Sequence, residues 1–182
     1  NGVLIVTLNR PQKKNAVNTE MWIALRETFN TAEADDSVVC VLLTGSGDNF
    51  CAGVDLSSFS EAAEGEEHPF ESAARAVAAF GKPVVAAVKG VAVGGGATVL
   101  FHCDMVYVGE SLRMRLPFAN LGLVPEWASS YMLQANIGAQ RAAELFYTAQ
   151  WIDADKALDC GIAAAVLPDE QLVEHAFGKA KE

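Results

Sequence analysis

Apolar residues recur along the chain at two spacings, one typical of strands and the other of helices. Val3–Leu8 is rich in β-branched residues and predicts a strand. Residues 38–43 are continuously apolar, as in a strand that is covered on both faces. Between these strands, Asn18 or Thr19 is expected to cap a helix. The apolar positions of this helix share one face, and they are Trp22, Leu25, Phe29 and Ala32.

The rest of the chain continues to alternate between strands and helices. A helix is predicted over residues 72–80, and a strand opens after Pro83. A glycine turn then leads into a second buried helix, residues 105–109 form a further strand, and the sequence is mostly helical from Ala139 onward. Residues 57–71 are rich in glutamate and predict a mobile surface loop with a frayed helix start. This alternation predicts an α/β layered fold.

Length and composition favour one compact domain. The chain has 182 residues, of which 51% are hydrophobic, and it can therefore bury a sizeable core. No apolar stretch is long enough to cross a bilayer, and the first residues lack the pattern of a secretory signal, so we expect no membrane partner. The sequence begins without methionine, directly in a predicted strand, and whether it is a fragment stays open.

Charge and cysteine usage exclude several classes of partner. The formal net charge of −10 argues against nucleic-acid binding, because no basic face attracts phosphates. The four cysteines are scattered and suit reduced core residues, which predicts a cytoplasmic location. The three histidines lie at no ligand spacing from a cysteine or a carboxylate, so no metal is predicted.

Two glycine-containing turns follow predicted buried strands. The first is "NFCAGVDL", with Gly53 at its bend, and the second is the run Gly94, Gly95 and Gly96. Glycine lets the backbone bend sharply and approach a ligand closely. Tight packing between a strand and a helix would explain the glycines of the second turn about as well as a role in ligand binding would. Its spacing is neither that of a dinucleotide-binding fingerprint nor that of a P-loop.

The two turns together resemble those of the crotonase (enoyl-CoA hydratase/isomerase) superfamily. The segments that carry the resemblance are "NFCAGVDL" and "KPVVAAVKGVAVGGGATVLFHCDMVYV", with "VTLNRPQKKNAVN" before them and "AQRAAELFYTAQWIDADKALDCGIAAAVLP" after them. The resemblance implies an α/β spiral of ββα units with C-terminal helices. Residues 1–182 would form a single crotonase-like domain that lacks the family's final C-terminal helices. The resemblance further implies an acyl-CoA thioester substrate, no cofactor beyond the coenzyme A of that substrate, and a homotrimer or hexamer.

By the same resemblance, two main-chain amides bind the thioester oxygen. The donors would be the N–H groups of Val54 and Gly95, with Gly53 bending the first turn and Gly94 and Gly96 shaping the second. Removal of a proton next to the carbonyl creates an enolate, and two fixed donors stabilise its oxygen. The loss of one such donor typically lowers the rate about 100- to 1,000-fold.

The resemblance also implies a site for the coenzyme A part of the substrate. Ala52, Asp55 and Leu56 would frame the adenine pocket, mostly through backbone groups. Lys13 and Lys14 lie where the family often holds the CoA phosphates with a basic residue. A solvated loop charge is nearly as good an explanation for each lysine, because its flexible side chain makes no geometric demand.

The two glutamates that activate water in the hydratases of this family are absent. The matching positions hold Thr98 and Phe118, and neither side chain can take a proton from water near neutral pH. Ordinary hydration of a double bond is therefore not expected, and both residues would line the substrate site instead.

Glu126, in "LGLVPEWASSY", is the candidate base. An acid directly after proline also suits the start of a helix, but the segment resembles the Δ3,Δ2-enoyl-CoA isomerase branch, which carries its catalytic glutamate here. The resemblance implies that Glu126 moves a proton from C2 to C4, with a pKa raised by apolar neighbours. Trp127 and Phe118 would line this pocket, or serve as ordinary core aromatics.

Several alternatives stay open at this stage. Other crotonase chemistry is possible: a ring-type acyl-CoA isomerase, a dehalogenase or a hydratase. A non-catalytic acyl-CoA-binding module would explain the two missing glutamates, and a thiol enzyme built on Cys51 is the remotest option. His102 is expected to be packed and not catalytic, and Asp104 is expected to be buried and hydrogen-bonded.

Overall fold

The computed structural model describes residues 2–55, 57 and 67–182. Its main sheet has the strand order β1-β2-β3-β5-β7, and all neighbouring strands are parallel. These strands are β1 (Val3–Leu8), β2 (Cys40–Gly45), β3 (Val84–Val88), β5 (Met105–Gly109) and β7 (Ala165–Leu167). A smaller parallel pair consists of β4 (Val91–Val93) and β6 (Arg113–Arg115). The predicted α/β fold is confirmed.

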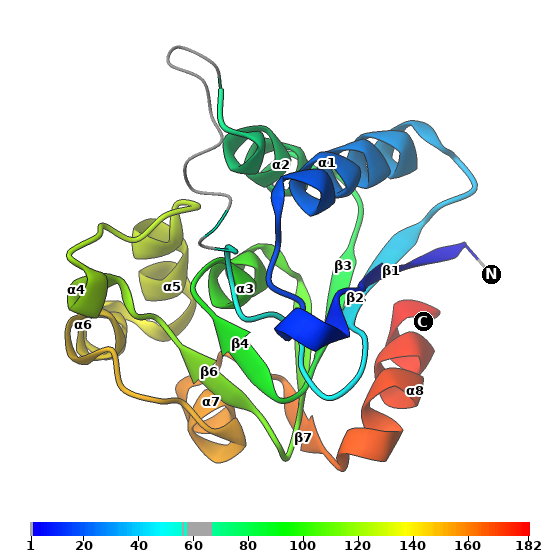
Figure 1. Ribbon diagram of the computed structural model, residues 1–182. Helices are drawn as coiled ribbons and strands as arrows, with labels where there is room; N and C mark the ends of the chain where they lie inside the picture. Colours follow the sequence, from blue (N-terminus) through cyan, green and yellow to red (C-terminus); the bar gives the residue numbers. More distant parts are fainter. Residues whose placement is uncertain (1, 56, 58–66) are drawn as a thin grey trace.

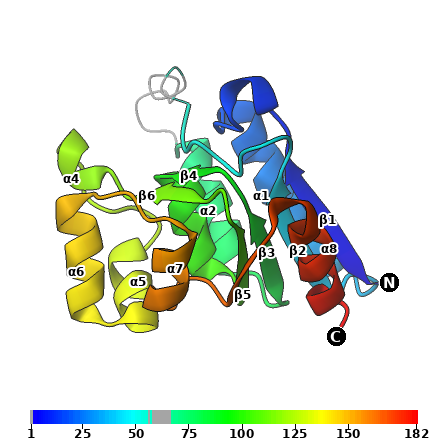
Figure 2. The ribbon, with the colours of Figure 1, turned by 90° about the horizontal axis from the view of Figure 1, so that it is seen from below.

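Helices cover both faces of the main sheet and gather at one side of it (Figures 1 and 2). The helices are α1 (Thr19–Ala34), α2 (Pro69–Ala78), α3 (Gly95–Thr98), α4 (Phe118–Leu121), α5 (Ser129–Ile137), α6 (Ala139–Thr148), α7 (Ala154–Cys160) and α8 (Asp169–Ala180), with 3-10 turns at η1 (Pro11–Lys13) and η3 (Val99–His102). In Figure 2, α1 and α2 lie on one face, α8 lies on the other, and α4 to α7 form a separate group beside β4 and β6.

The alternation of side chains along the strands explains this layering. Leu42 and Val85 are register partners and belong to the apolar cluster that contains the buried residues of α8. Val41 and Leu43 belong to the larger cluster that includes the buried faces of α1 and α2. Because successive strand residues point to opposite faces, strands covered on both sides are apolar throughout.

The first helix follows its sequence pattern. Asn18 is its N-cap, and the side-chain oxygen of Asn18 accepts a hydrogen bond from the amide of Met21 at 3.1 Å. All four residues of the predicted apolar face are buried. This helix therefore brings Trp22 into the core beside the glycine turns.

Three local predictions are corrected. The predicted strand after Pro83 breaks at Gly90, which has a φ of +60°, and it becomes β3 and β4. The predicted second buried helix is only α3 followed by the 3-10 turn η3. Asp104 is exposed, not buried, although its Oδ2 does accept a hydrogen bond from the amide of Val84 at 2.8 Å. Most of the glutamate-rich stretch, residues 58–66, lies outside the described residues.

Candidate functional site

The two glycine turns lie directly against each other. Cys51 and Ala92 form a parallel bridge, and the amide of Val93 donates to the carbonyl of Cys51 at 3.0 Å. Gly53 has a φ of +94°, and a Cβ at this position would lie 2.6 Å from the carbonyl oxygen of Val93 and 3.8 Å from the amide nitrogen of Gly95. Residue 53 therefore has to be glycine, both for its backbone angle and for the contact.

The amides of Val54 and Gly95 are left available by this arrangement. Val17 donates to the carbonyl of Gly53 at 2.8 Å and accepts from the amide of Asp55 at 2.9 Å, so it uses the backbone groups on either side of residue 54. Among the described residues, neither the amide of Val54 nor that of Gly95 has a hydrogen-bond acceptor. A Cβ on Gly95 would lie 3.8 Å from the Cγ2 atom of Val54, which shows how close the two turns are.

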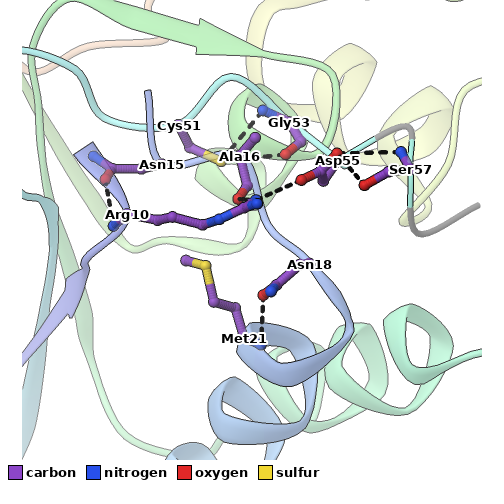
Figure 3. A network of polar contacts seen from close by, with 9 residues as sticks. All are labelled: Arg10, Asn15, Ala16, Asn18, Met21, Cys51, Gly53, Asp55 and Ser57. Atoms are coloured by element: carbon purple, nitrogen blue, oxygen red, sulfur yellow. Dashed lines mark hydrogen bonds and ion pairs between the residues drawn. The ribbon is translucent and has the colours of Figure 1, made fainter. Parts of the chain in front are cut away.

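A polar network fastens the first turn to the loop after β1 (Figure 3). Arg10 Nη1 donates to Asp55 Oδ2 at 2.5 Å and to the carbonyl of Ala16 at 3.1 Å. Asn15 is fully buried, accepts from the amide of Arg10 at 2.9 Å and donates to the carbonyl of Asn49 at 2.7 Å. The strand, the loop and the turn are therefore held as one unit.

The carboxylate of Asp55 is committed to this network. Hydrogen bonds from Arg10 and then from Ser57 lower the pKa of Asp55 to about 2. Its Oδ2 pairs with Arg10, and its Oδ1 accepts from the hydroxyl of Ser57 at 2.8 Å. Both oxygens are occupied, so the side chain of Asp55 serves to position the turn.

Glu126 lies beside the second turn with one oxygen bonded and the other free. Thr98, which is fully buried in α3, donates from its hydroxyl to Glu126 Oε1 at 2.8 Å. Glu126 Oε2 is buried and has no hydrogen-bond partner among the described residues. Burial raises the pKa of Glu126 to about 7, and the bond from Thr98 opposes this rise. This environment suits a general base at neutral pH.

An unusual backbone presents Glu126. The next two residues, Trp127 and Ala128, have φ values of +54° and +50°, and such angles cost non-glycine residues about 1–3 kcal/mol each. The amide and hydroxyl of Ser129 both donate to the carbonyl of Glu126, at 2.9 and 2.5 Å. His102 Nε2 donates to the carbonyl of Trp127 at 2.7 Å. These bonds hold the left-handed turn in place.

The side chain of Trp127 anchors the same turn to neighbouring elements. Its indole N–H donates to the carbonyl of Ala74 in α2 at 3.0 Å. Its ring makes edge-to-face contacts with Trp22 and Phe70. The roles of His102, Ser129 and Trp22 at this site were not predicted, because their side chains act through the backbone or through packing and leave no motif in the sequence.

The remaining candidate residues are more scattered. Phe118 is buried and contacts Phe146, with ring centroids 6.2 Å apart. Lys13 and Lys14 are exposed and have no ion-pair partner in the part of the chain that the structure describes. Ala52 donates from its amide to the carbonyl of Lys14 at 2.9 Å, and Leu56 lies outside the described residues.

Cys51 does not have the environment of a nucleophile. It is 1% exposed, and burial raises the pKa of its thiol to about 12. Almost no thiolate would form near neutral pH, since thiolate character is what makes a cysteine reactive. Within the described ranges, no group of three or more histidine, cysteine or carboxylate residues could hold a metal ion, and no helix is long and apolar enough to span a bilayer.

Comparison with known proteins identifies the family. The sequence profile described as enoyl-CoA hydratase/isomerase matches residues 1–182. The chain belongs to this family. The resemblance to the crotonase superfamily is thereby confirmed, and so is the crotonase-like fold that it implied.

Named relatives of this enoyl-CoA hydratase/isomerase family member include both types of enzyme. The chain is 36% identical to "1,2-epoxyphenylacetyl-CoA isomerase" of Escherichia coli (strain K12), over 96% of this chain and 70% of the relative. It is 33% identical to "Enoyl-CoA delta isomerase 2" of Homo sapiens, over 99% of this chain and 48% of the relative. It is also 33% identical to "2,3-dehydroadipyl-CoA hydratase" of Escherichia coli (strain K12), over 96% of this chain and 69% of the relative.

Solved structures of the enoyl-CoA hydratase/isomerase family show the same fold. The crystal structure of enoyl-CoA hydratase/isomerase from Pseudoalteromonas atlantica T6c superposes with a TM-score of 0.94 at 39% identity, over 99% of this chain and 72% of that one. Family membership supports an enzyme with acyl-CoA hydratase/isomerase chemistry, and the names of the relatives do not decide between the two reactions.

Proposed function

We propose that this chain is an enoyl-CoA isomerase that moves a double bond of an acyl-CoA thioester from C3 to C2. The observation that carries the proposal is the carboxylate of Glu126. Its Oε2 is buried and has no hydrogen-bond partner among the described residues. Desolvation raises its pKa to about 7, and its Oε1 accepts from Thr98, three residues beyond Gly95. A single base that can exist both protonated and ionised near pH 7 suits a reaction that takes and returns one proton.

In the proposed mechanism, the thioester oxygen accepts hydrogen bonds from the amides of Val54 and Gly95. Glu126 Oε2 takes a proton from C2, and the electron pair of that C–H bond enters the conjugated enolate. The enolate then collapses with a new double bond between C2 and C3, and C4 takes the proton back from Glu126. No atom is gained or lost, and the carboxylate ends the cycle ionised. The two amides stabilise the charge on the oxygen between the two proton transfers.

The same residues argue against hydration. Water addition in this family would require carboxylates at positions 98 and 118, where the chain has Thr98 and Phe118. Phe118 is buried against Phe146, and Thr98 donates its hydroxyl to Glu126. Among the described residues, the acid beside the second glycine turn is thus Glu126, the one expected of an isomerase.

A second candidate is isomerisation of a ring-type acyl-CoA. The similarity to a protein named 1,2-epoxyphenylacetyl-CoA isomerase favours it, and it would use the same base and the same amides.

The proposal has three further parts. The coenzyme A part of the substrate is bound by Lys13, Lys14, Ala52 and residue 55. The protein assembles into a trimer or hexamer, and its location is cytoplasmic.

The proposed function is tested by following double-bond migration and hydration separately. The protein is incubated in heavy water with a 3-enoyl-CoA and, in a second reaction, with a 2-enoyl-CoA. We expect conversion of the first to the 2-enoyl form, exchange of C2 protons for deuterium, and no 3-hydroxyacyl product from the second. Hydration without migration would overturn the assignment. Tight binding without any proton exchange would support a non-catalytic binding module.

Replacing Thr98 with valine is expected to move the pH profile of the reaction upward. The Thr98 hydroxyl lowers the pKa of Glu126, so its removal leaves desolvation unopposed and raises that pKa above about 7. Since the ionised form is the base, the rising limb of kcat/KM against pH should shift to higher pH. Thr44→Val is the matched control, because Thr44 is also buried but donates to the carbonyl of Ala87 in β3. An unchanged midpoint in Thr98→Val would contradict the bond's role.

A further inference from the structure

The apolar space beside the second glycine turn is almost completely filled. A cavity of about 10 Å³ lies here, and its lining includes Gly95, Gly96, Trp127, Trp22, Cys51 and Val99. Such a volume is about that of one water-sized sphere, whereas pockets for drug-sized ligands have about 300–1,000 Å³. Between the described residues, little room is therefore present for a hydrocarbon chain at this point.

Trp22 is one of the two tryptophans that border this space. It comes from α1 and is 1% exposed, and its Cη2 atom lies 3.8 Å from the position that a Cβ on Gly95 would take. Its ring is in edge-to-face contact with Phe70, at 5.1 Å between centroids, and with Trp127, at 6.1 Å. The indole of Trp22 thus lies at the meeting point of the glycine turn, α2 and the turn that carries Glu126.

The indole N–H of Trp22 indicates which property of the side chain matters here. It is buried and has no hydrogen-bond acceptor among the described residues. An unpaired buried donor is unfavourable, so hydrogen bonding does not explain a tryptophan at this position. What the side chain contributes is its volume and its aromatic contacts.

We propose that Trp22 limits the acyl group of the substrate to a short chain. The inference rests on the proposed function in placing the thioester oxygen at the amides of Val54 and Gly95. With the oxygen there and C2 and C4 within reach of Glu126, the following carbons meet Trp22 and Trp127. In the part of the chain that the structure describes, a longer acyl group has no room beside this turn unless Trp22 moves, and Trp22 is held by close packing on several sides.

The test compares thioesters of different length in four proteins. The 3-enoyl-CoA esters of six and ten carbons are assayed with the wild type, Trp22→Leu, Trp22→Phe and Phe29→Leu. Trp22→Leu makes room, and Trp22→Phe removes the unpaired N–H but keeps a ring. Phe29→Leu is the matched control, because Phe29 is equally buried in α1 but contacts Phe80 and does not line the cavity.

We expect the wild type to prefer the six-carbon ester, and Trp22→Leu to raise the ten-to-six ratio of kcat/KM by about 10-fold or more, as methylene discrimination in an apolar pocket allows. Trp22→Phe should change this ratio less, and Phe29→Leu should leave it unchanged. An equal ratio in the wild type and Trp22→Leu, or the same shift in Phe29→Leu, would overturn the inference.

Binding measurements separate this inference from the proposed function. Affinities of saturated hexanoyl-CoA and decanoyl-CoA are measured by calorimetry for the same four proteins. If no protein moves a double bond but Trp22→Leu still gains affinity for decanoyl-CoA alone, the proposed reaction is wrong and the length limit stands. If isomerisation is observed but length has no effect on either rate or affinity, the length limit is wrong and the reaction stands. Absence of any acyl-CoA binding would overturn both.

Discussion

Replacing Glu126 with glutamine is expected to lower the rate of double-bond migration by about 100- to 10,000-fold, the range typical of a lost general base. Glutamine has nearly the same shape and still accepts the hydrogen bond from Thr98, but its amide cannot take a proton from C2. Affinity for a saturated acyl-CoA should change little. The measurements are kcat for a 3-enoyl-CoA and the Kd of its saturated analogue.

The same substitution should also stabilise the protein at alkaline pH. Burial raises the pKa of Glu126 from 4.5 to about 7 in the folded state, so the folded state binds more protons than the unfolded state between these values. Stability is therefore lost as the pH rises from about 4.5 to about 7, and above that range the ionised carboxylate costs about 3 kcal/mol. Glu126→Gln should raise Tm at pH 8 and have little effect near pH 4.5.

Glu174→Gln is the control for both measurements. Glu174 is exposed on α8, which covers the other face of the sheet (Figure 2). Its replacement should change neither the rate nor the dependence of Tm on pH. If Glu126→Gln retained full turnover, Glu126 would have no role as the base, and a flat difference in Tm across pH would contradict its desolvation.

Replacing Gly53 with alanine is expected to lower kcat by about 100-fold or more, because it moves the first amide donor away from the second. The new Cβ would lie 2.6 Å from the carbonyl oxygen of Val93, a backbone atom that cannot turn aside, and residue 53 has a φ of +94°. The two turns must therefore separate. Activity and thermal stability should both fall, and they are measured on the same samples.

Gly161→Ala separates the effect of the contact from that of the backbone angle. Gly161 caps α7 with a φ of +85°, but a Cβ there would meet no atom within 4 Å. This variant should lose about 1–2 kcal/mol of stability, the usual cost of a side chain in the left-handed region, and keep its activity. A comparable loss of kcat in both variants would show that stability alone, and not the separation of the turns, governs the rate.

The elements that could be predicted from the sequence are those with periodic apolar residues or glycine-rich turns. The apolar face of α1 follows from residue spacing, and the parallel strands follow from continuous apolar runs. The contact between the two turns could not be derived from either turn alone, since it depends on the bridge between Cys51 and Ala92, which are 41 positions apart. The run Gly94–Gly96 alone could be explained equally well by close approach to a ligand or by tight packing between a strand and a helix. The presence of the first turn beside it favours the ligand.

The less predictable part is the support around Glu126. Trp127 and Ala128 take left-handed angles that neither residue type favours, and hydrogen bonds from distant residues such as His102 help to hold them. For Asp104, the family position suggested burial, but this residue directly precedes β5 and lies at the surface. Local sequence carries no signal for constraints that come from distant neighbours.

The chain contains three tryptophans, and two of them, Trp22 and Trp127, touch each other next to the glycine turn. Their emission therefore arises beside the site that the proposed function assigns to the acyl group. A ligand that alters the polarity or quenching around either ring would change the intrinsic fluorescence of the protein. The fold thus supplies its own optical probe of occupancy, without any attached label.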